Sequence, residues 1–144
     1  MSAREFRELA ERLTKALVEG DFALYAQVME LPLRIEPRDG NPYTLETEAA
    51  LREDFELYCN NIRLHGINDI YREVTEVEEP DETQKIVTCL VNLLRRSGRA
   101  VDPFHSVMWM RLGADGWRFH RIQSSLGHIN WTLGQAGIDD GSFT

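Results

Sequence analysis

The sequence is poor in the residues that build metal sites and disulfide frameworks. Its 144 residues include two cysteines and four histidines. These residues are Cys59, Cys89, His65, His105, His120 and His128. They show no metal-ligand spacing, and the cysteines lie far apart in regularly patterned segments. We therefore expect no metal, no cofactor and two buried, reduced thiols.

A basic surface and long apolar runs are also missing. The formal net charge is −8, whereas a protein that binds nucleic acid would normally carry a basic face to neutralise phosphates. The same acidity argues against an electrostatic membrane binder. No segment is apolar over the length needed to span a bilayer, and the start, MSAREFRELAERL, has no signal-like apolar run. We expect a cytoplasmic protein without nucleic-acid or membrane partners.

What the sequence does contain is the composition of one globular domain, with 42% hydrophobic residues. Apolar residues recur at helical spacing over 2–19, 22–29 and 47–64, and each segment is bounded by capping residues. We expect one domain over 1–126. Residues 127–144, which hold four of the ten glycines, are expected to form an irregular tail.

After Gly66 the period of the pattern changes from helical to two. A short extended piece is predicted at 31–37, and longer strands at 70–79, 85–96, 104–112 and 117–124. Helices followed by a run of strands indicate an α+β domain. We predict a cone-shaped, curved antiparallel sheet wrapped around the three N-terminal helices, with a pocket inside the cone.

The last hairpin, HSVMWMRLGADGWRFHRIQSS, is apolar on both faces, and two registers are open. A four-residue loop, 113–116, places Leu112 opposite Trp117, whereas a three-residue loop places Arg121 beside Trp109 and His120 in the pocket. We prefer the first register, because it gathers the large apolar residues on one surface. Its inward face carries Met108, Met110, Leu112, Trp117, Phe119, Arg121 and Gln123. Its outward face carries His105, Val107, Trp109, Arg111, Arg118, His120 and Ile122.

Two stretches, ALVEGDFALYAQVMELPLRIEP and MRLGADGWRFHRIQ, resemble the nuclear transport factor 2-like superfamily over roughly residues 3–125. That superfamily includes ketosteroid isomerase, scytalone dehydratase, SnoaL-type polyketide cyclases and the β subunits of ring-hydroxylating dioxygenases. The resemblance implies a cystatin-like α+β barrel, often dimeric, with a central pocket. It places Glu36 nearest the general base of the isomerase. Met108 and Leu13 stand where the isomerase has its oxyanion-stabilising Asp and Tyr.

The inward face of the hairpin and the apolar helical stripes supply the candidate ligand site. The expected lining is Arg121, Gln123, Trp117, Phe119, Tyr58, Tyr25, Met108 and Met110. Arg121 is open to three interpretations: it binds an anionic ligand, it pairs with Glu36 or Asp54, or it reaches solvent at the mouth.

The outward face is too aromatic and too basic for plain solvent surface. We expect Trp109, His120, Val107, Ile122 and Arg111 to form a homodimer interface, since Trp and Arg are enriched at interface cores. Two functions remain open. One is a non-catalytic small-molecule-binding protein for an anionic or hydrophobic ligand. The other is a metal-independent acid–base enzyme, an isomerase, dehydratase or cyclase, with Glu36 as its base.

Overall fold

The computed structural model describes residues 3–37, 41–96, 98–100 and 102–124. The predicted tail, 127–144, lies outside the described residues. The helices are α1 (Arg4–Glu19), α2 (Phe22–Val28) and α3 (Glu48–Leu64). The strands are β1 (Met29–Pro37), β2 (Tyr43–Leu45), β3 (Asp69–Asp81), β4 (Gln84–Arg95), β5 (Gly98–Arg99), β6 (Phe104–Gly113) and β7 (Gly116–Ser124).

Three of the helix ends lie at residues that local chemistry favours, whereas α1 begins without a side-chain cap. Gly20 ends α1 in the left-handed conformation, with φ of 71°. The Asp21 carboxylate accepts a hydrogen bond from the Leu24 amide at 3.1 Å and caps α2. The Thr47 hydroxyl does the same for the Ala50 amide of α3, also at 3.1 Å. Among the described residues, no helix is both long and apolar enough to cross a membrane.

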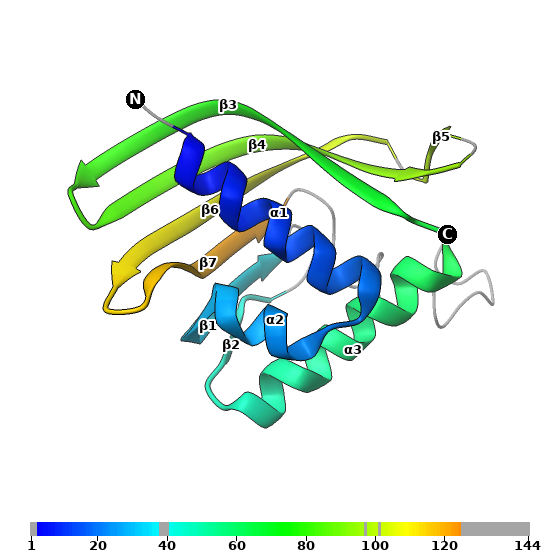
Figure 1. The fold of residues 1–144 in the computed structure, drawn as a ribbon, viewed down its shortest axis with the longest axis horizontal. Coiled ribbons are helices and arrows are strands. Elements are labelled where there is room, and N and C mark those ends of the chain that lie inside the picture. Colours follow the sequence, from blue (N-terminus) through cyan, green and yellow to red (C-terminus); the bar gives the residue numbers. More distant parts are fainter. Residues whose placement is uncertain (1–2, 38–40, 97, 101, 125–144) are drawn as a thin grey trace.

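The sheet is mixed rather than wholly antiparallel. Its strands follow the order β2-β1-β7-β6-β4-β3, and β5 pairs with β4 off this path. The expected sheet is antiparallel throughout, and this is wrong for one pair of strands. After the three long strands β3, β4 and β6, the chain forms β7, which pairs in parallel with β1. In Figure 1 the long strands curve over α1, and the α+β arrangement of helices against a bent sheet is confirmed.

The hairpin of β6 and β7 contains both registers that the sequence left open. Near the turn, Leu112 lies opposite Trp117 and Met110 opposite Phe119, as in the preferred register. The register then shifts between Met110 and Trp109, and Trp109 lies opposite Arg121. His120 is the extra residue of this β-bulge. All residues of β7 beyond His120 therefore face the side opposite to the one we predicted.

The methionine side of β6 nevertheless faces the helices, as expected. Met108 and Met110 are 3% and 0% exposed and belong to the core, and Phe119 packs edge-on against Phe6 of α1 with ring centroids 6.1 Å apart. Trp109 lies on the opposite, outer face of the sheet and is half-buried. The core thus lies between the helices and the concave face of the sheet.

Candidate functional site

A cavity of about 110 Å³ lies between the three helices and the inner face of the sheet. Most of its lining is apolar. The apolar lining residues are Leu13, Leu17, Met29, Ile35, Ile62, Ile70, Val91, Leu93, Phe104, Met108 and Ile122. Five polar residues complete it, namely Tyr25, Tyr58, Arg72, Ser106 and Ser124. A mostly apolar cavity with a few convergent polar groups is the usual form of a small-ligand site.

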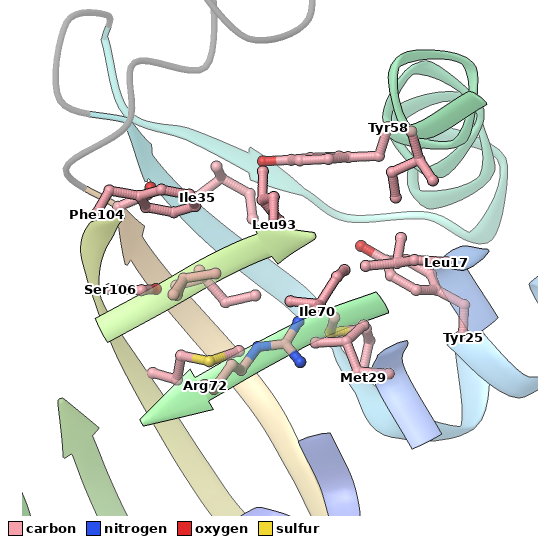
Figure 2. A pocket seen from close by; sticks show the side chains of 16 residues that line it. Leu17, Tyr25, Met29, Ile35, Tyr58, Ile70, Arg72, Leu93, Phe104 and Ser106 are labelled. Atoms are coloured by element: carbon pink, nitrogen blue, oxygen red, sulfur yellow. The ribbon is translucent and has the colours of Figure 1, made fainter. Parts of the chain in front are cut away.

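Arg72 is the one cation among the described residues of this lining. It lies on β3, opposite Val91 of β4, so that its side chain extends under the sheet toward α1. Its Nη1 atom donates to the Thr14 hydroxyl at 2.7 Å and to the Ala10 carbonyl at 3.3 Å. Burial lowers the pKa of the guanidinium, and Cys89 and Asp69 act in the opposite sense. Figure 2 shows the guanidinium among the side chains that enclose the cavity.

Two tyrosines form another part of the wall, with a buried carboxylate close to them. The hydroxyls of Tyr25 and Tyr58 point into the cavity in Figure 2. Burial raises the pKa of both phenols, and the charge of Asp54 raises it further. Asp54, on α3, is 6% exposed and accepts a hydrogen bond from the Tyr43 hydroxyl at 3.0 Å. The two phenols therefore stay protonated, and a protonated phenol is a hydrogen-bond donor.

Three of the predicted ligand-site residues line this cavity: Tyr25, Tyr58 and Met108. Met110 and Phe119 are fully buried on the same face but do not reach it. Trp117, at the start of β7 next to the turn, packs against the core, with the Lys85 ammonium 5.6 Å from its ring centroid.

The β-bulge places other residues of β7 on the face opposite to the predicted one. Arg121 and Gln123 lie on the outer face, and Gln123 borders an open hollow there. Ile122, predicted for the dimer interface, lies opposite Met108 and lines the cavity. His120 is half-buried and is absent from the cavity lining, contrary to the alternative register. Burial lowers the pKa of His120, and Arg111 lowers it further.

Glu36, the candidate general base, is also on the outer face. Its carboxylate is paired with Arg34 at 2.8 Å and with Arg121 at 3.0 Å. The Arg121 guanidinium also stacks on Trp109, 4.1 Å from the ring centroid. Burial alone would raise the pKa of Glu36, but the hydrogen bonds from Arg121 and Arg34 outweigh it and lower the pKa. Of the three interpretations of Arg121, the structure selects the ion pair with Glu36, and a carboxylate held by two guanidiniums is a weak base.

The sequence interpretation missed Arg72 as a site residue. The available signal was its position on the alternating stripe Ile70–Arg72–Val74, where a charge replaces an apolar residue. A second missed signal concerns the bulge: the apolar residues Trp117, Phe119 and Ile122 are spaced by two and then by three. A strand of strict period two cannot keep all three side chains on one face.

The part of the chain that the structure describes contains no group of three or more His, Cys, Asp or Glu placed to hold a metal ion.

Comparisons by sequence give no relative: no protein-family model matches the chain, and no curated protein matches it. Comparisons by structure do. An NTF-2-like protein of unknown function from Shewanella oneidensis superposes with a TM-score of 0.67 at 16% identity, covering 87% of this chain and 99% of that one. An NTF2-like protein with a cystatin-like fold from Novosphingobium aromaticivorans gives 0.60 at 15% identity, covering 85% and 80%.

A candidate ketosteroid isomerase from Shewanella frigidimarina also superposes, with a TM-score of 0.60 at 16% identity, covering 82% of this chain and 92% of that one. Identities this low establish shape and leave activity open. The helices, the bent mixed sheet and these superpositions together show that the chain has the NTF2-like, cystatin-like fold.

Proposed function

We propose that this protein binds a small organic molecule with an apolar body in the cavity between its helices and its sheet. The observation that carries the proposal is the composition of that cavity, in which aliphatic side chains surround one guanidinium and two protonated phenols. An empty apolar cavity in a natural core lowers stability, because its lining loses packing contacts. Occupation by a ligand would restore those contacts.

The size of the cavity limits the ligand. An apolar cavity of about 150 Å³ accepts benzene, and the volume here is about 110 Å³. The occupant is therefore small, with a body of about four to six carbon atoms. Burying four methylenes contributes about 3 kcal/mol at roughly 0.8 kcal/mol each, so we expect weak to moderate affinity.

The test is a titration of the protein with butyrate, 1-butanol and cyclopentane, followed by NMR shifts of cavity methyl groups and by thermal unfolding. Val91→Phe places a ring in the cavity and should abolish the shifts, since Val91 is 5% exposed and lines it. Leu112→Phe, at a position 41% exposed at the end of the hairpin, is the matched control. If all three compounds leave the cavity methyls unshifted, the proposal fails.

A homodimer through the outer face of the sheet is the second part of the proposal. The central strands present half-buried apolar side chains there, and at least one paired row runs across the strands from acid to base. One row runs from Glu78 through Ile86 and Trp109 to Arg121. A two-fold axis along the strands would place the acidic edge of each copy over the basic edge of the other, whereas an axis across the strands would oppose like charges.

Trp109→Asp should convert this dimer to a monomer in sedimentation, and added salt should weaken the wild-type dimer. Leu64→Asp, at a position 71% exposed on α3, is the control and should leave the mass unchanged. A wild-type monomer at micromolar concentration would refute the interface.

We also propose a cytoplasmic location, since Cys59 and Cys89 are both free thiols in the buried core.

Acid–base catalysis is a second candidate, favoured by the position of Asp54 beside two cavity phenols. In this version Asp54 replaces Glu36 as the functional carboxylate, with Tyr25 or Tyr58 as the hydrogen-bond donor to a carbonyl oxygen. The probe is cyclopentanone in D₂O, whose α-protons would exchange faster with wild-type protein than with Asp54→Asn. Equal exchange rates for the two proteins would remove the enzymatic candidate and leave the binding proposal intact.

A further inference from the structure

We infer that the ligand is a compact carboxylic acid, bound as its carboxylate by Arg72. The inference rests on the proposed function, because it names the chemical class of the molecule in the same cavity. It goes beyond that function in assigning one residue the task of selecting the ligand.

The hydrogen bonds of Arg72 leave one edge of its guanidinium available. A guanidinium carries five N–H groups, and the bonds to Thr14 and Ala10 both use Nη1. Nε and Nη2 donate to no described residue, and no carboxylate of the described residues forms an ion pair with Arg72. The two atoms lie on the same side edge of the planar group. That edge presents two parallel N–H groups, which is the arrangement that a carboxylate accepts as a bidentate pair.

The fixed end of the guanidinium makes this edge a prepared site. Nη1 is held at 2.7 Å by the Thr14 hydroxyl of α1, while the side chain starts from β3. The long side chain of Arg72 therefore loses part of its rotamer freedom before any ligand arrives. A group already ordered in its bound geometry gives up less entropy on binding.

The charges around the cavity favour one orientation of the ligand. The negative charge of Asp54 acts on Tyr25 and Tyr58. Asp69 acts on the pKa of Arg72 without forming an ion pair with it. A carboxylate is thus attracted to Arg72 and repelled from the wall formed by the tyrosines. The apolar body then lies against the aliphatic residues and the phenols.

Water is the competing partner for the available edge. Arg72 also borders a polar groove between α1 and β3, so water in that groove can solvate its N–H groups. If water is the partner, the guanidinium contributes nothing to ligand choice. Binding would then follow the size of the apolar body alone.

The experiment compares butyrate with 1-butanol, which have the same carbon chain, by NMR titration at pH 7 on the full chain. A charge-assisted, bidentate pair should make butyrate bind about 10- to 100-fold more tightly than the alcohol. Arg72→Met should remove this preference and leave alcohol binding within about twofold. Arg72→Lys should retain a reduced preference, because it keeps the charge and loses the fork. Arg12→Met, the same substitution at an exposed position of α1, should behave as wild type.

Equal affinity of the wild type for butyrate and 1-butanol overturns the inference and leaves the cavity proposal standing. Binding of neither compound overturns the inference, and the cavity proposal fails as well only if cyclopentane also leaves the cavity methyls unshifted. If Arg72→Met does not fold, the wild-type ratio and Arg72→Lys still decide, since a preference unchanged in Arg72→Lys would contradict recognition by the guanidinium fork.

Discussion

Deletion of a single residue tests the β-bulge that divides β7 between the two faces of the sheet. A one-residue deletion in a central strand normally turns every later side chain to the other face. His120 is the extra residue in the bulge, so its deletion should leave Phe119 opposite Met110 and Arg121 opposite Trp109. Because no side chain changes face, we expect a loss of about 1–2 kcal/mol, typical of local strand adjustment.

Deletion of Arg118 is the matched control. It also removes one residue. If Arg121 stays opposite Trp109 and the strands pair regularly from there to the turn, His120 comes to lie opposite Met110 and Phe119 turns outward. Phe119 is 0% exposed, and the loss of a buried Phe contributes about 3–5 kcal/mol. Placing an imidazole in the core adds about 1–3 kcal/mol. The sum, about 4–8 kcal/mol, approaches the whole stability of a domain of this size.

Urea unfolding followed by circular dichroism measures both deletions. The expected order is wild type, then the His120 deletion, then the Arg118 deletion, which is unfolded or nearly so. NMR should still show Ile122 contacting cavity methyls after deletion of His120. Equal destabilisation by the two deletions would refute the assignment of His120 as the residue that sets the register.

Three further predictions follow from contacts of single side chains. Arg121→Leu should leave butyrate binding unchanged, and it should raise the pKa of Glu36, measured by carboxyl NMR. The pKa of Glu36 is lower in the folded protein than its ordinary value. The ion pair therefore contributes its full stability when the pH is above the ordinary pKa, and this contribution is lost as the pH falls through the folded pKa. The variant should therefore lose less stability than wild type on acidification, and an equal loss would contradict the ion pair. Tyr43→Phe removes the hydroxyl that donates to buried Asp54, and thermal unfolding should show a loss of about 1.5–3 kcal/mol. Thr47→Ala removes the cap of α3 and should destabilise by about 1 kcal/mol, whereas Thr47→Ser should restore most of it.

The sequence was sufficient for the three helices, the five longer strands and the inward face of β6, but the short strands β2 and β5 were not predicted. Helical spacing, the caps at Asp21 and Thr47, and the change to period two after Gly66 all act over a few residues. A local pattern can therefore specify them without knowledge of the partner strand. The inward position of Met108 and Met110 follows in the same way, because a regular strand alternates its faces.

Two bulges mark the limit of that reasoning. In β3 the inward residues Val74 and Val77 are three apart, and the register with β4 shifts at that point. In β7 the same spacing separates Phe119 from Ile122, where the register with β6 shifts. A break in the period signals a bulge in each strand, but its meaning for the site depends on the neighbouring strands.

Only the tertiary structure decided which charges meet the cavity. Arg121 was expected there and lies outside with Glu36, because β7 bulges at His120 and pairs with β1. Arg72 was not expected there, and the curved sheet brings it under α1 beside Thr14, 58 residues away in sequence. Local periodicity determined which residues share a strand. Pairing between strands that are distant in sequence determined which charged side chains lie inside the fold and which lie outside. No short stretch of the chain contains both strands of such a pair.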